Sequence, residues 1–324
     1  MSSTLHSLEG DAERIAAADA RIRSHVRWTP LERSASLSMS LGTDVFLKLE
    51  CWQPTRSFKV RGAFNAVAAL PEDERARGLV TASAGNHGQA IALAGAAFSA
   101  KALVFVPYDA PEAKKRRIRE LGARIDDSAA DYDEAERLAV QHAQSSGAVF
   151  INAFSDPEVV AGQGTVGLEI LADLPAVRTI VSPVGGGGLI AGIGEAVKSR
   201  SPSVRVIGAQ SVETRVMFES LRTGRVVELP VTPTLADGLA GGIDGASFER
   251  VRRVVDGVHL VEEAAIAGAI RSLFEREGVV AEGAAATAVA ILDTLRGQID
   301  GPVVVVITGG NIDGNRLARI LANT

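Results

Sequence analysis

The sequence predicts an α/β protein built from two lobes, each a mostly parallel sheet flanked by helices. Short apolar stretches of strand length alternate along the chain with alanine-rich stretches of helical length, a pattern typical of buried parallel sheets. With 324 residues, the chain is longer than a single hydrophobic core usually supports, so two lobes are expected. A content of 46% hydrophobic and 23% charged residues is ordinary for a globular protein.

The predicted strands are short apolar runs that end close to turn-forming residues. They cover residues 46–49, 79–81, 103–106, 149–151, 179–181, 204–209, 259–261 and 303–308. Helices are expected between them, the clearest at residues 11–26, 62–70, 89–98 and 189–199.

A turn-rich segment at residues 152–157 indicates a crossing between the lobes. We therefore expect a small domain at residues 55–155. Residues 1–54 and 156–324 are expected to form a large domain together. A cleft between two such lobes is a common place for a ligand.

Composition and charge exclude several classes of function. The net charge of −5 argues against a nucleic-acid-binding surface, and the basic run at residues 114–119 fits a solvated helix face. The single cysteine, Cys51, allows no internal disulfide, which fits a reducing cytosol. No cysteine and histidine cluster has the spacing of a zinc site, so no metal is predicted. No stretch is suited to a membrane span or a signal peptide, and we expect a cytoplasmic protein.

Residues 185–188 are four consecutive glycines between a predicted strand and a predicted helix. Bare backbone N–H groups at a helix N-terminus attract phosphate, and the absence of side chains lets the anion approach closely. Gly186, Gly188 and Ala191 also match the pattern of a dinucleotide site. That alternative needs an acid at the end of the next strand, where the sequence has Gln210. A plain tight turn is the other alternative, although four glycines cost more backbone entropy than a turn requires.

Lys59 stands in a Ser-Phe-Lys-Val-Arg-Gly-Ala sequence, in a turn before a predicted helix. A lysine in such a turn is usually just exposed. A nucleophilic lysine must instead be shielded from water, so that its amine is neutral. Phe58 and Phe64 are expected to supply the apolar surround.

Two further turns carry polar groups. Ser83-Ala84-Gly85-Asn86-His87-Gly88 precedes a helix, and such a helix N-terminus suits a carboxylate, while Asn86 can donate to a ring oxygen. The alternative for this turn is an ordinary helix cap by Ser83 or Asn86. Thr308 is the final residue of the last predicted strand, and its hydroxyl can pair with a neutral pyridine nitrogen. Binding of pyridoxal 5'-phosphate requires an amine for its aldehyde, an amide for its ring oxygen, a loop for its phosphate and a hydroxyl for its ring nitrogen. The four segments described above supply this set.

These stretches, in their order and spacing, resemble the fold-type II pyridoxal-phosphate enzymes, which share the tryptophan synthase β-like fold. Within them the sequence is most similar to the serine/threonine dehydratase (threonine ammonia-lyase) and serine racemase group. Further matching stretches lie at residues 156–165, 236–240 and 308–313, and the resemblance covers about residues 11–320. It implies pyridoxal 5'-phosphate as the cofactor, bound mainly by the large domain, an amino acid as the substrate, and a homodimer.

The resemblance also implies roles for individual residues. Lys59 would form the Schiff base and then remove the α-proton, as the catalytic residue. The cofactor would be bound by Phe58, Lys59, Asn86, Gly185, Gly186, Gly187, Gly188, Leu189, Gly238, Glu282 and Thr308. The substrate carboxylate would be bound by Ser83, Ala84, Gly85, Asn86 and His87.

The expected reaction is dehydration of a β-hydroxy-α-amino acid, L-threonine or L-serine, to a 2-oxo acid and ammonia. Racemases of the group have a serine as second base at the position of Ala84, and alanine cannot carry a proton. Gln210 and Val216 stand where cation-binding relatives have acids, so no cation is expected there.

Several alternatives stay open. Arg56 replaces an expected glycine, and if its side chain enters the site, a β-hydroxyaspartate-type dehydratase is the alternative. The others are a β-replacement synthase similar to threonine synthase, and a cofactor-binding protein that has lost turnover.

Overall fold

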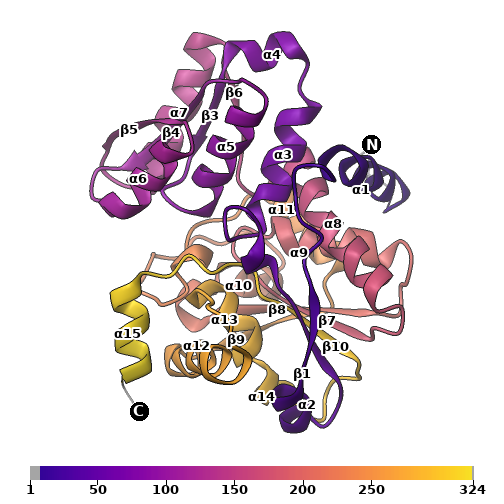
Figure 1. Cartoon of the computed structure of the whole chain (residues 1–324). Coiled ribbons are helices and arrows are strands. Elements are labelled where there is room, and N and C mark those ends of the chain that lie inside the picture. Colours follow the sequence, from indigo (N-terminus) through magenta and orange to yellow (C-terminus); the bar gives the residue numbers. More distant parts are fainter. Residues whose placement is uncertain (1–7, 323–324) are drawn as a thin grey trace.

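Two separate β-sheets with helices packed around them form the molecule (Figure 1). The computed structural model describes residues 8–322. The larger sheet has six strands, in the spatial order β1 (Leu31–Ser34), β2 (Val45–Lys48), β10 (Val303–Val306), β7 (Thr179–Pro183), β8 (Arg205–Ser211) and β9 (Gly257–Val261). All neighbouring strands run parallel except β1 and β2, which are antiparallel.

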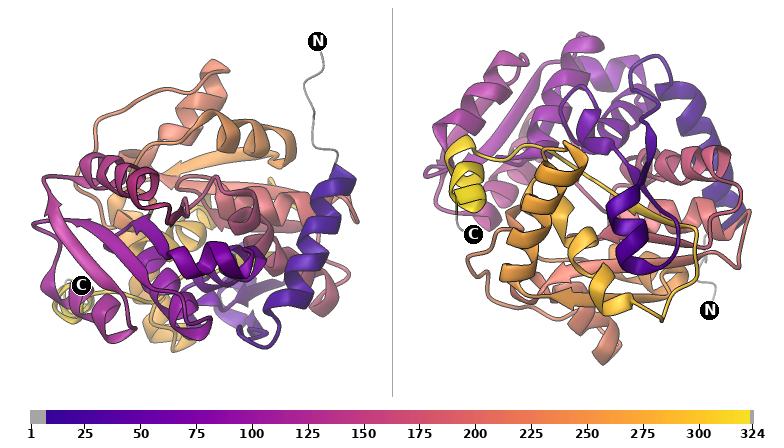
Figure 2. Two further views of the ribbon diagram at one scale, coloured as in Figure 1. Left: turned by 90° about the horizontal axis from the view of Figure 1, so that it is seen from above. Right: turned by 60° about the horizontal axis from the view of Figure 1, so that its bottom comes forward.

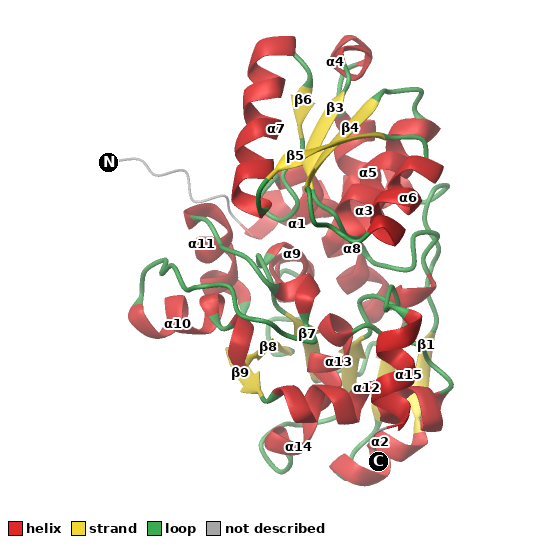
Figure 3. Cartoon of the chain, turned by 90° about the vertical axis from the view of Figure 1, so that its left-hand side faces the viewer, coloured by secondary structure: helices red, strands yellow, loops and turns green. Residues whose placement is uncertain are grey.

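The smaller sheet is entirely parallel. Its strands lie in the order β5 (Arg124–Ala129), β4 (Ala102–Pro107), β3 (Leu79–Ala82) and β6 (Val149–Phe150). Helix α7 (Tyr132–Ser146) lies on one side of this sheet, and α5 (Asn86–Ala97) and α6 (Glu112–Glu120) lie on the other (Figure 3). The sheet is therefore covered on both faces, as parallel sheets require.

The central strand β10 shows why the larger sheet is covered on both faces as well. Val303 and Val305 belong to the core formed with α12 (Glu263–Glu277) and α13 (Gly283–Ala290). Val304 and Val306 belong to the core on the opposite face, which includes α9 (Gly188–Lys198). Because successive side chains of a strand point to opposite faces, an unbroken run of valines fits this position.

The two lobes are joined by a close helix pair. Helices α3 (Lys59–Ala69) and α8 (Pro157–Asp173) meet where Gly62 faces Gly162. A Cβ on Gly162 would lie 2.6 Å from the carbonyl oxygen of Arg61. Only residues without a side chain allow the two backbones to approach so closely. The helix that begins with Lys59 is thereby held against the large lobe.

The remaining elements complete both lobes. They are α1 (Leu8–Ile22), α2 (Ala35–Leu41), α4 (Glu72–Arg77), α10 (Val216–Thr223), α11 (Gly245–Val254), α14 (Leu292–Leu295), α15 (Gly314–Ala322) and three short 3₁₀ helices, η1 (Glu50–Trp52), η2 (Val212–Thr214) and η3 (Asp237–Leu239). Helices α1 and α15 lie on opposite sides of the molecule (Figure 2). None of the helices among residues 8–322 is long and apolar enough to cross a membrane.

All eight predicted strands are present, with shifted ends, but two strands were missed. Strands β1 and β5 lie at sheet edges, and most of their residues are partly or fully exposed. They therefore lack the apolar pattern by which the other strands were predicted. Helices α3 and α5 begin at Lys59 and Asn86, rather than at residues 62 and 89 as predicted, and α1 ends at Ile22 rather than at residue 26.

The strands of the smaller sheet fall within residues 79–150, and those of the larger sheet fall outside this range. The domain bounds at residues 55 and 155 stay a prediction. In the larger sheet, β10 lies between β2 and β7, and all three strands run in the same direction. The loops that follow these three strands all start at the edge of the sheet that is formed by the carboxyl ends of the parallel strands. At this point the order of the strands along the chain reverses. Open α/β sheets commonly bind ligands at such an edge.

Candidate active site

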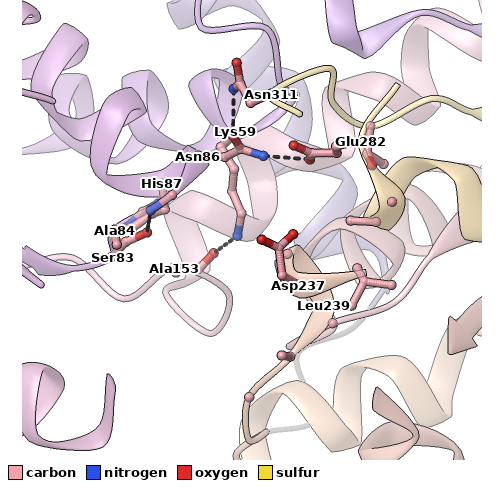
Figure 4. Close-up of a pocket in the computed structure, with 18 of the residues that line it drawn as sticks. Lys59, Ser83, Ala84, Asn86, His87, Ala153, Asp237, Leu239, Glu282 and Asn311 are labelled. Carbon is pink, nitrogen blue, oxygen red and sulfur yellow. Dashed lines mark hydrogen bonds between the residues drawn. The ribbon is translucent and has the colours of Figure 1, made fainter. Parts of the chain in front are cut away.

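A cavity of about 650 Å³ lies at this edge, between the two lobes (Figure 4). Its size is within the range of small-molecule sites. The structure brings together at its wall every residue that the sequence predicted to be catalytic, cofactor-binding or substrate-binding. They are Phe58, Lys59, Ser83, Ala84, Gly85, Asn86, His87, Gly185, Gly186, Gly187, Gly188, Leu189, Gly238, Glu282 and Thr308. Their individual roles stay predictions.

The segment before Lys59 is held against the segment that follows β10. Ser57 forms an antiparallel bridge with Gly309. The backbone N–H of Phe58 donates to the carbonyl oxygen of Thr308 at 3.0 Å, and the N–H of Gly310 donates to the carbonyl of Arg56 at 2.9 Å. This backbone pairing places Lys59 beside Thr308, although the two are far apart in the sequence.

A buried ion cluster fixes the helix that begins with Lys59. Arg61 is fully buried, and its guanidinium contacts Glu50 at 2.7 Å and Glu169 at 2.8 Å. Glu50 belongs to η1 after β2, and Glu169 belongs to α8. Buried charges are tolerated when they are paired and hydrogen-bonded in this way. The first turn of α3 is thus connected to two elements of the large lobe.

The amine of Lys59 lies in the cavity and is enclosed by protein. Its Nζ donates to the carbonyl oxygen of Ala153 at 2.9 Å and lies 5.3 Å from the centre of the Phe58 ring. Burial lowers the pKa of Lys59 to about 8, while the negative charge of Glu282 opposes that shift. A substantial fraction of the amine is therefore neutral near pH 8, as a nucleophilic lysine requires. Phe64 was expected here too, but it packs against His25 and Phe98 in the core of the small lobe.

The glycine loop ends at the N-terminus of α9. Gly187 precedes the helix with a φ of +93°, a left-handed conformation that favours glycine, and no side chain caps the helix. A Cβ on Gly186 would lie 2.3 Å from the Phe154 ring, and a Cβ on Gly188 would lie 2.5 Å from the Phe154 carbonyl oxygen. Phe154 therefore imposes glycine at two positions of the loop. The free N–H groups at this end of α9 can receive a phosphate.

The second helix N-terminus at the cavity is that of α5. Gly85 precedes the helix, and no side chain caps it. The expected alternative, an ordinary cap by Ser83 or Asn86, is therefore wrong. Ser83 Oγ instead accepts from the N–H of Gly85 at 3.2 Å. Free N–H groups on α5 are available for a carboxylate.

His87 is held in its neutral form beside α5. Burial, together with the smaller effect of the charge of Lys59, lowers its pKa to about 3. Its Nε2 lies 3.3 Å from the carbonyl oxygen of Ile151, which can only accept, so the proton belongs on Nε2. Its buried Nδ1 has no hydrogen-bond partner in the protein.

Asn86 lies between two residues of the large lobe. Its Nδ2 donates to Glu282 Oε1 at 2.8 Å, and its Oδ1 accepts from Asn311 at 2.7 Å (Figure 4). Burial raises the pKa of Glu282 to about 7, and the charge of Asp237 contributes to that shift. A Cβ on Gly309 would lie 2.3 Å from Glu282 Oε1, so this glycine leaves room for the carboxyl group.

Some residues of the cavity wall had been given no role from the sequence. Ala153 and Phe154 lie in the segment that was predicted only as a turn. Asn152 Oδ1 accepts from the N–H of Phe154 and from that of Ser155, both at 3.0 Å, which fixes the turn. An asparagine in a turn signals this local structure, but nothing in the sequence shows that the turn faces Lys59.

Tyr132, Asp237 and Asn311 also line the cavity. Tyr132 is the first residue of α7, and Asp237 is the first residue of η3. Asp237 and Asn311 stand in stretches that carried the family resemblance, but no role had been assigned to either.

Several residues singled out by the sequence lie outside the cavity wall. Arg56 is exposed, has a positive φ of 57°, which fits the glycine that was expected there, and does not line the cavity. Cys51 is buried, and burial raises the pKa of its thiol to about 12. A nucleophilic cysteine has a lowered pKa instead. Among residues 8–322, no three His, Cys, Asp or Glu side chains are grouped so that they could hold a metal ion.

Gln210 was the residue that argued against a dinucleotide site. Its side chain is buried and is hydrogen-bonded to backbone groups. Its Nε2 donates to the carbonyl oxygens of Val184 at 3.1 Å and Thr214 at 2.7 Å. Its Oε1 accepts from the N–H of Phe218 at 2.8 Å. The side chain is therefore fully engaged and is not available to a ribose.

Comparison with known proteins identifies the family. The model of the family described as "Pyridoxal-phosphate dependent enzyme" matches residues 22–309. The chain belongs to this family. The predicted cofactor and the predicted fold type are thereby confirmed.

Individual relatives show which members of the family the chain is similar to. The chain is 46% identical over 312 residues to the L-threonine ammonia-lyase of Thermotoga maritima, with 95% of this chain and 77% of the relative covered. Among solved structures, a threonine deaminase isoform 2 from Solanum lycopersicum is 31% identical, with a TM-score of 0.93 and coverage of 99% and 90%. Maize serine racemase is 32% identical, with a TM-score of 0.91 and coverage of 95% and 96%. The group that the sequence resembled is therefore confirmed.

The residues present fit pyridoxal 5'-phosphate. The uncapped N-terminus of α9 suits its phosphate, and the Lys59 amine suits its aldehyde. The Thr308 hydroxyl and the Asn86 amide line the same cavity and suit the ring nitrogen and the ring oxygen. When bound, the cofactor supplies an electron sink for a carbanion at the α-carbon of an amino acid.

Proposed function

We propose that this pyridoxal-phosphate-dependent enzyme is an ammonia-lyase that converts L-threonine to 2-oxobutanoate and ammonia. Its relatives named above are a threonine ammonia-lyase, a threonine deaminase and a serine racemase. The observation that carries the proposal is the Lys59 amine, with a pKa of about 8, in a cavity that two uncapped helix N-termini also line. L-serine, which has the same hydroxyl without the methyl group, is the second candidate substrate.

Some groups of the site bind the cofactor and the substrate, and Lys59 transfers a proton. The N–H groups of α9 bind the cofactor phosphate, and those of α5 bind the substrate carboxylate. Lys59 would hold the cofactor through Nζ, and the same Nζ would take the α-proton of the substrate as a general base. The β-hydroxyl would leave as water, which uses one proton and so balances the α-proton removed by Lys59. The released unsaturated amine would then react with one water to give the 2-oxo acid and ammonia. Asn86 would orient the cofactor ring by donating an N–H to the ring oxygen.

Ala84 favours elimination over racemisation. Racemisation needs a second group that gives a proton to the α-carbon from the side opposite the lysine. Ala84 lines the cavity at the turn where racemases of the group have a serine, and its methyl group carries no exchangeable proton. A substrate that has lost its α-proton then proceeds to loss of the hydroxyl.

Three of the basic side chains that line the cavity are paired with protein groups. Lys114 and Arg316 contact Asp237 at 3.2 and 3.8 Å, and Arg117 donates to Asn311. These basic side chains are thus engaged by protein groups, and Arg56 does not line the cavity. A second substrate carboxylate would have to compete for them. This weighs against the β-hydroxyaspartate-type alternative.

The test is a product analysis of the protein loaded with cofactor. L-threonine, L-serine and L-threo-3-hydroxyaspartate are supplied separately, each with and without a thiol acceptor, and 2-oxo acids and new amino acids are quantified by chromatography. We expect 2-oxobutanoate from L-threonine and no thiol adduct. A thiol-dependent amino acid would favour the β-replacement alternative, and no product from any substrate would favour a protein without turnover.

Lysine variants belong in the same analysis. Lys59→Ala should lower turnover at least about a thousandfold, because it removes both the covalent attachment and the general base. Lys101→Ala, an exposed lysine of the small lobe, is the matched control and should leave turnover unchanged. Retained activity in Lys59→Ala would overturn the assignment of the nucleophile.

The same proposal includes the assembly and the cell compartment. We propose a homodimer, as implied by the family resemblance, and a cytoplasmic location, which fits the single reduced cysteine. Light scattering on the purified protein measures its mass directly, and a monomer would contradict the first point.

A further inference from the structure

Asn311 joins both lobes at the cavity wall through its side-chain amide. Its Nδ2 donates to the carbonyl oxygen of Thr55 at 2.9 Å and to Oδ1 of Asn86 at 2.7 Å. Its Oδ1 accepts from Nη1 of Arg117, on α6 of the small lobe, at 3.1 Å. Figure 4 shows Asn311 next to Asn86, with Glu282 on the other side of Asn86.

The partners of Asn311 leave its amide only one orientation. The carbonyl of Thr55 can only accept a hydrogen bond, and the guanidinium of Arg117 can only donate one. If the amide of Asn311 were turned round, both hydrogen bonds would be lost. Its N–H₂ must therefore face Thr55 and Asn86.

This orientation determines that of Asn86 in turn. Asn86 must offer its oxygen to the N–H₂ of Asn311, so its own Nδ2 is directed to Glu282 Oε1, at 2.8 Å, and to the cavity. An amide is nearly symmetric in shape, and only its hydrogen-bond partners decide which end points where. Turned round, Asn86 would present a carbonyl oxygen to the cavity.

We propose that Asn311 is a positioning residue that fixes the Asn86 amide so that an N–H group, and not a carbonyl, meets the ring oxygen of the cofactor. The inference rests on the proposed function, in which Asn86 donates to that oxygen. An N–H stabilises a negatively charged ring oxygen, whereas a carbonyl repels it. Asn311 itself acts only through Asn86.

Asn311→Asp is the sharpest test because it changes shape very little. An aspartate oxygen replaces the N–H₂, so it can donate neither to Thr55 nor to Asn86, and it attracts the N–H₂ of Asn86 away from the cavity. The measurements are the dissociation constant of pyridoxal 5'-phosphate from the apo-protein and the pH midpoint of the absorbance of the bound cofactor. We expect binding to weaken roughly tenfold to hundredfold, because one hydrogen bond to a charged group is at stake.

Two further variants keep this test decisive. Asn315→Asp makes the same change at an exposed position of α15 and should bind the cofactor like the unaltered protein. Asn311→Ser removes the amide without adding charge and should also weaken binding, so a folding defect in the aspartate variant does not end the test. Equal binding by the Asn311 variants and Asn315→Asp would overturn the inference.

A double-mutant cycle with Asn86→Ala separates positioning from a general structural effect. If Asn311 acts through Asn86, then Asn311→Asp should weaken binding little further in the Asn86→Ala protein. The same loss in both backgrounds would contradict the inference. If the unaltered protein binds no cofactor, the proposed function itself fails, and that result is distinct from equal binding by all variants.

Discussion

At the scale of single residues, the site depends on two buried groups whose pKa values are displaced toward neutrality. Burial lowers the pKa of Lys59 to about 8 and raises that of Glu282 to about 7. The two shifts have the same cause, because burial disfavours the charged form of either group. Such displaced values are typical of functional sites. They allow the amine to be partly neutral under ordinary conditions.

The pH dependence of cofactor attachment tests this electrostatic account. Only the neutral amine attacks the aldehyde, so the rate should rise as the pH approaches 8 and level off above it. In Glu282→Gln, the charge that raises the pKa of Lys59 is absent, and the plateau should begin at lower pH. Stopped-flow absorbance of the apo-protein mixed with the cofactor measures both curves. A rate that still rises to pH 10, as for an ordinary lysine, would contradict the account.

Ala84 makes a second prediction at this scale. Ala84→Ser introduces a hydroxyl at the turn. Formation of D-serine from L-serine should then increase about tenfold or more, because a positioned acid or base contributes at least that much. Chiral chromatography measures the product. Ala318→Ser, at an exposed position of α15, is the control. If both variants formed D-serine equally slowly, the second-base explanation would be wrong.

The residues that could be placed at the site from the sequence are those whose type the chemistry requires. Lys59 and the glycine loop were predicted because few other residues supply a nucleophilic amine or a bare helix N-terminus. Asn311 was part of a recognised motif, but its role depends on Thr55 and Arg117, which are distant in the sequence. Phe154 could not be assigned because its contact with the glycine loop arises only from folding.

At the scale of secondary-structure elements, α9 and the turn at residues 152–155 form one unit. A Cβ on Gly188 would lie 2.5 Å from the carbonyl oxygen and 2.9 Å from the Cα of Phe154. Both atoms belong to the backbone, so they cannot move aside as a side-chain end could. The glycine loop and the wall beside Lys59 therefore depend on each other.

A pair of glycine substitutions tests this dependence. Gly188→Ala should destabilise the protein by about 1–3 kcal/mol, the range for overpacking, and should weaken cofactor binding. Gly268→Ala, in α12 where a Cβ meets nothing within 4 Å, should stabilise the protein by about 0.5–1 kcal/mol. Denaturant unfolding and cofactor titration measure the two effects. Equal stability of both variants would refute the close contact.

Edge strands show what the sequence could not predict at this scale. Strand β5 has the sequence Arg-Ile-Asp-Asp-Ser-Ala, and β4 is its one neighbouring strand among residues 8–322. Five of its six residues are partly or fully exposed. Their place in the sheet comes from pairing with a neighbour, and their own composition resembles a loop. The central strands are buried on both faces, and their apolar runs predicted them directly.

At the scale of the whole molecule, Gln210 connects three segments beside the glycine loop. It bonds to Val184, which directly precedes the loop, to Thr214 at the end of η2, and to Phe218 in α10. Its N–H₂ group satisfies two buried carbonyl oxygens. A glutamate here would leave those oxygens facing a carboxylate, and such a group of oxygens suits a divalent cation.

We therefore expect divalent cations to affect the protein only when Gln210 is replaced by glutamate. Treatment with EDTA, or addition of Mg²⁺ or Ca²⁺, should leave the melting temperature and activity of the unaltered protein unchanged. Gln210→Glu should melt at a lower temperature, and Mg²⁺ or Ca²⁺ should restore part of the loss. Differential scanning fluorimetry measures both. Loss of activity of the unaltered protein in EDTA would contradict the role given to Gln210.

We propose that Lys59 holds pyridoxal 5'-phosphate in a site that eliminates the hydroxyl of L-threonine. The most direct measurement is the absorbance spectrum of the loaded protein before and after addition of L-threonine, with the 2-oxo acid measured in the same sample. The account predicts a band from the lysine-linked cofactor that shifts on addition of L-threonine, together with accumulation of 2-oxobutanoate. A protein that shows no such band with added cofactor, or a band that shifts without any 2-oxo acid, would contradict it.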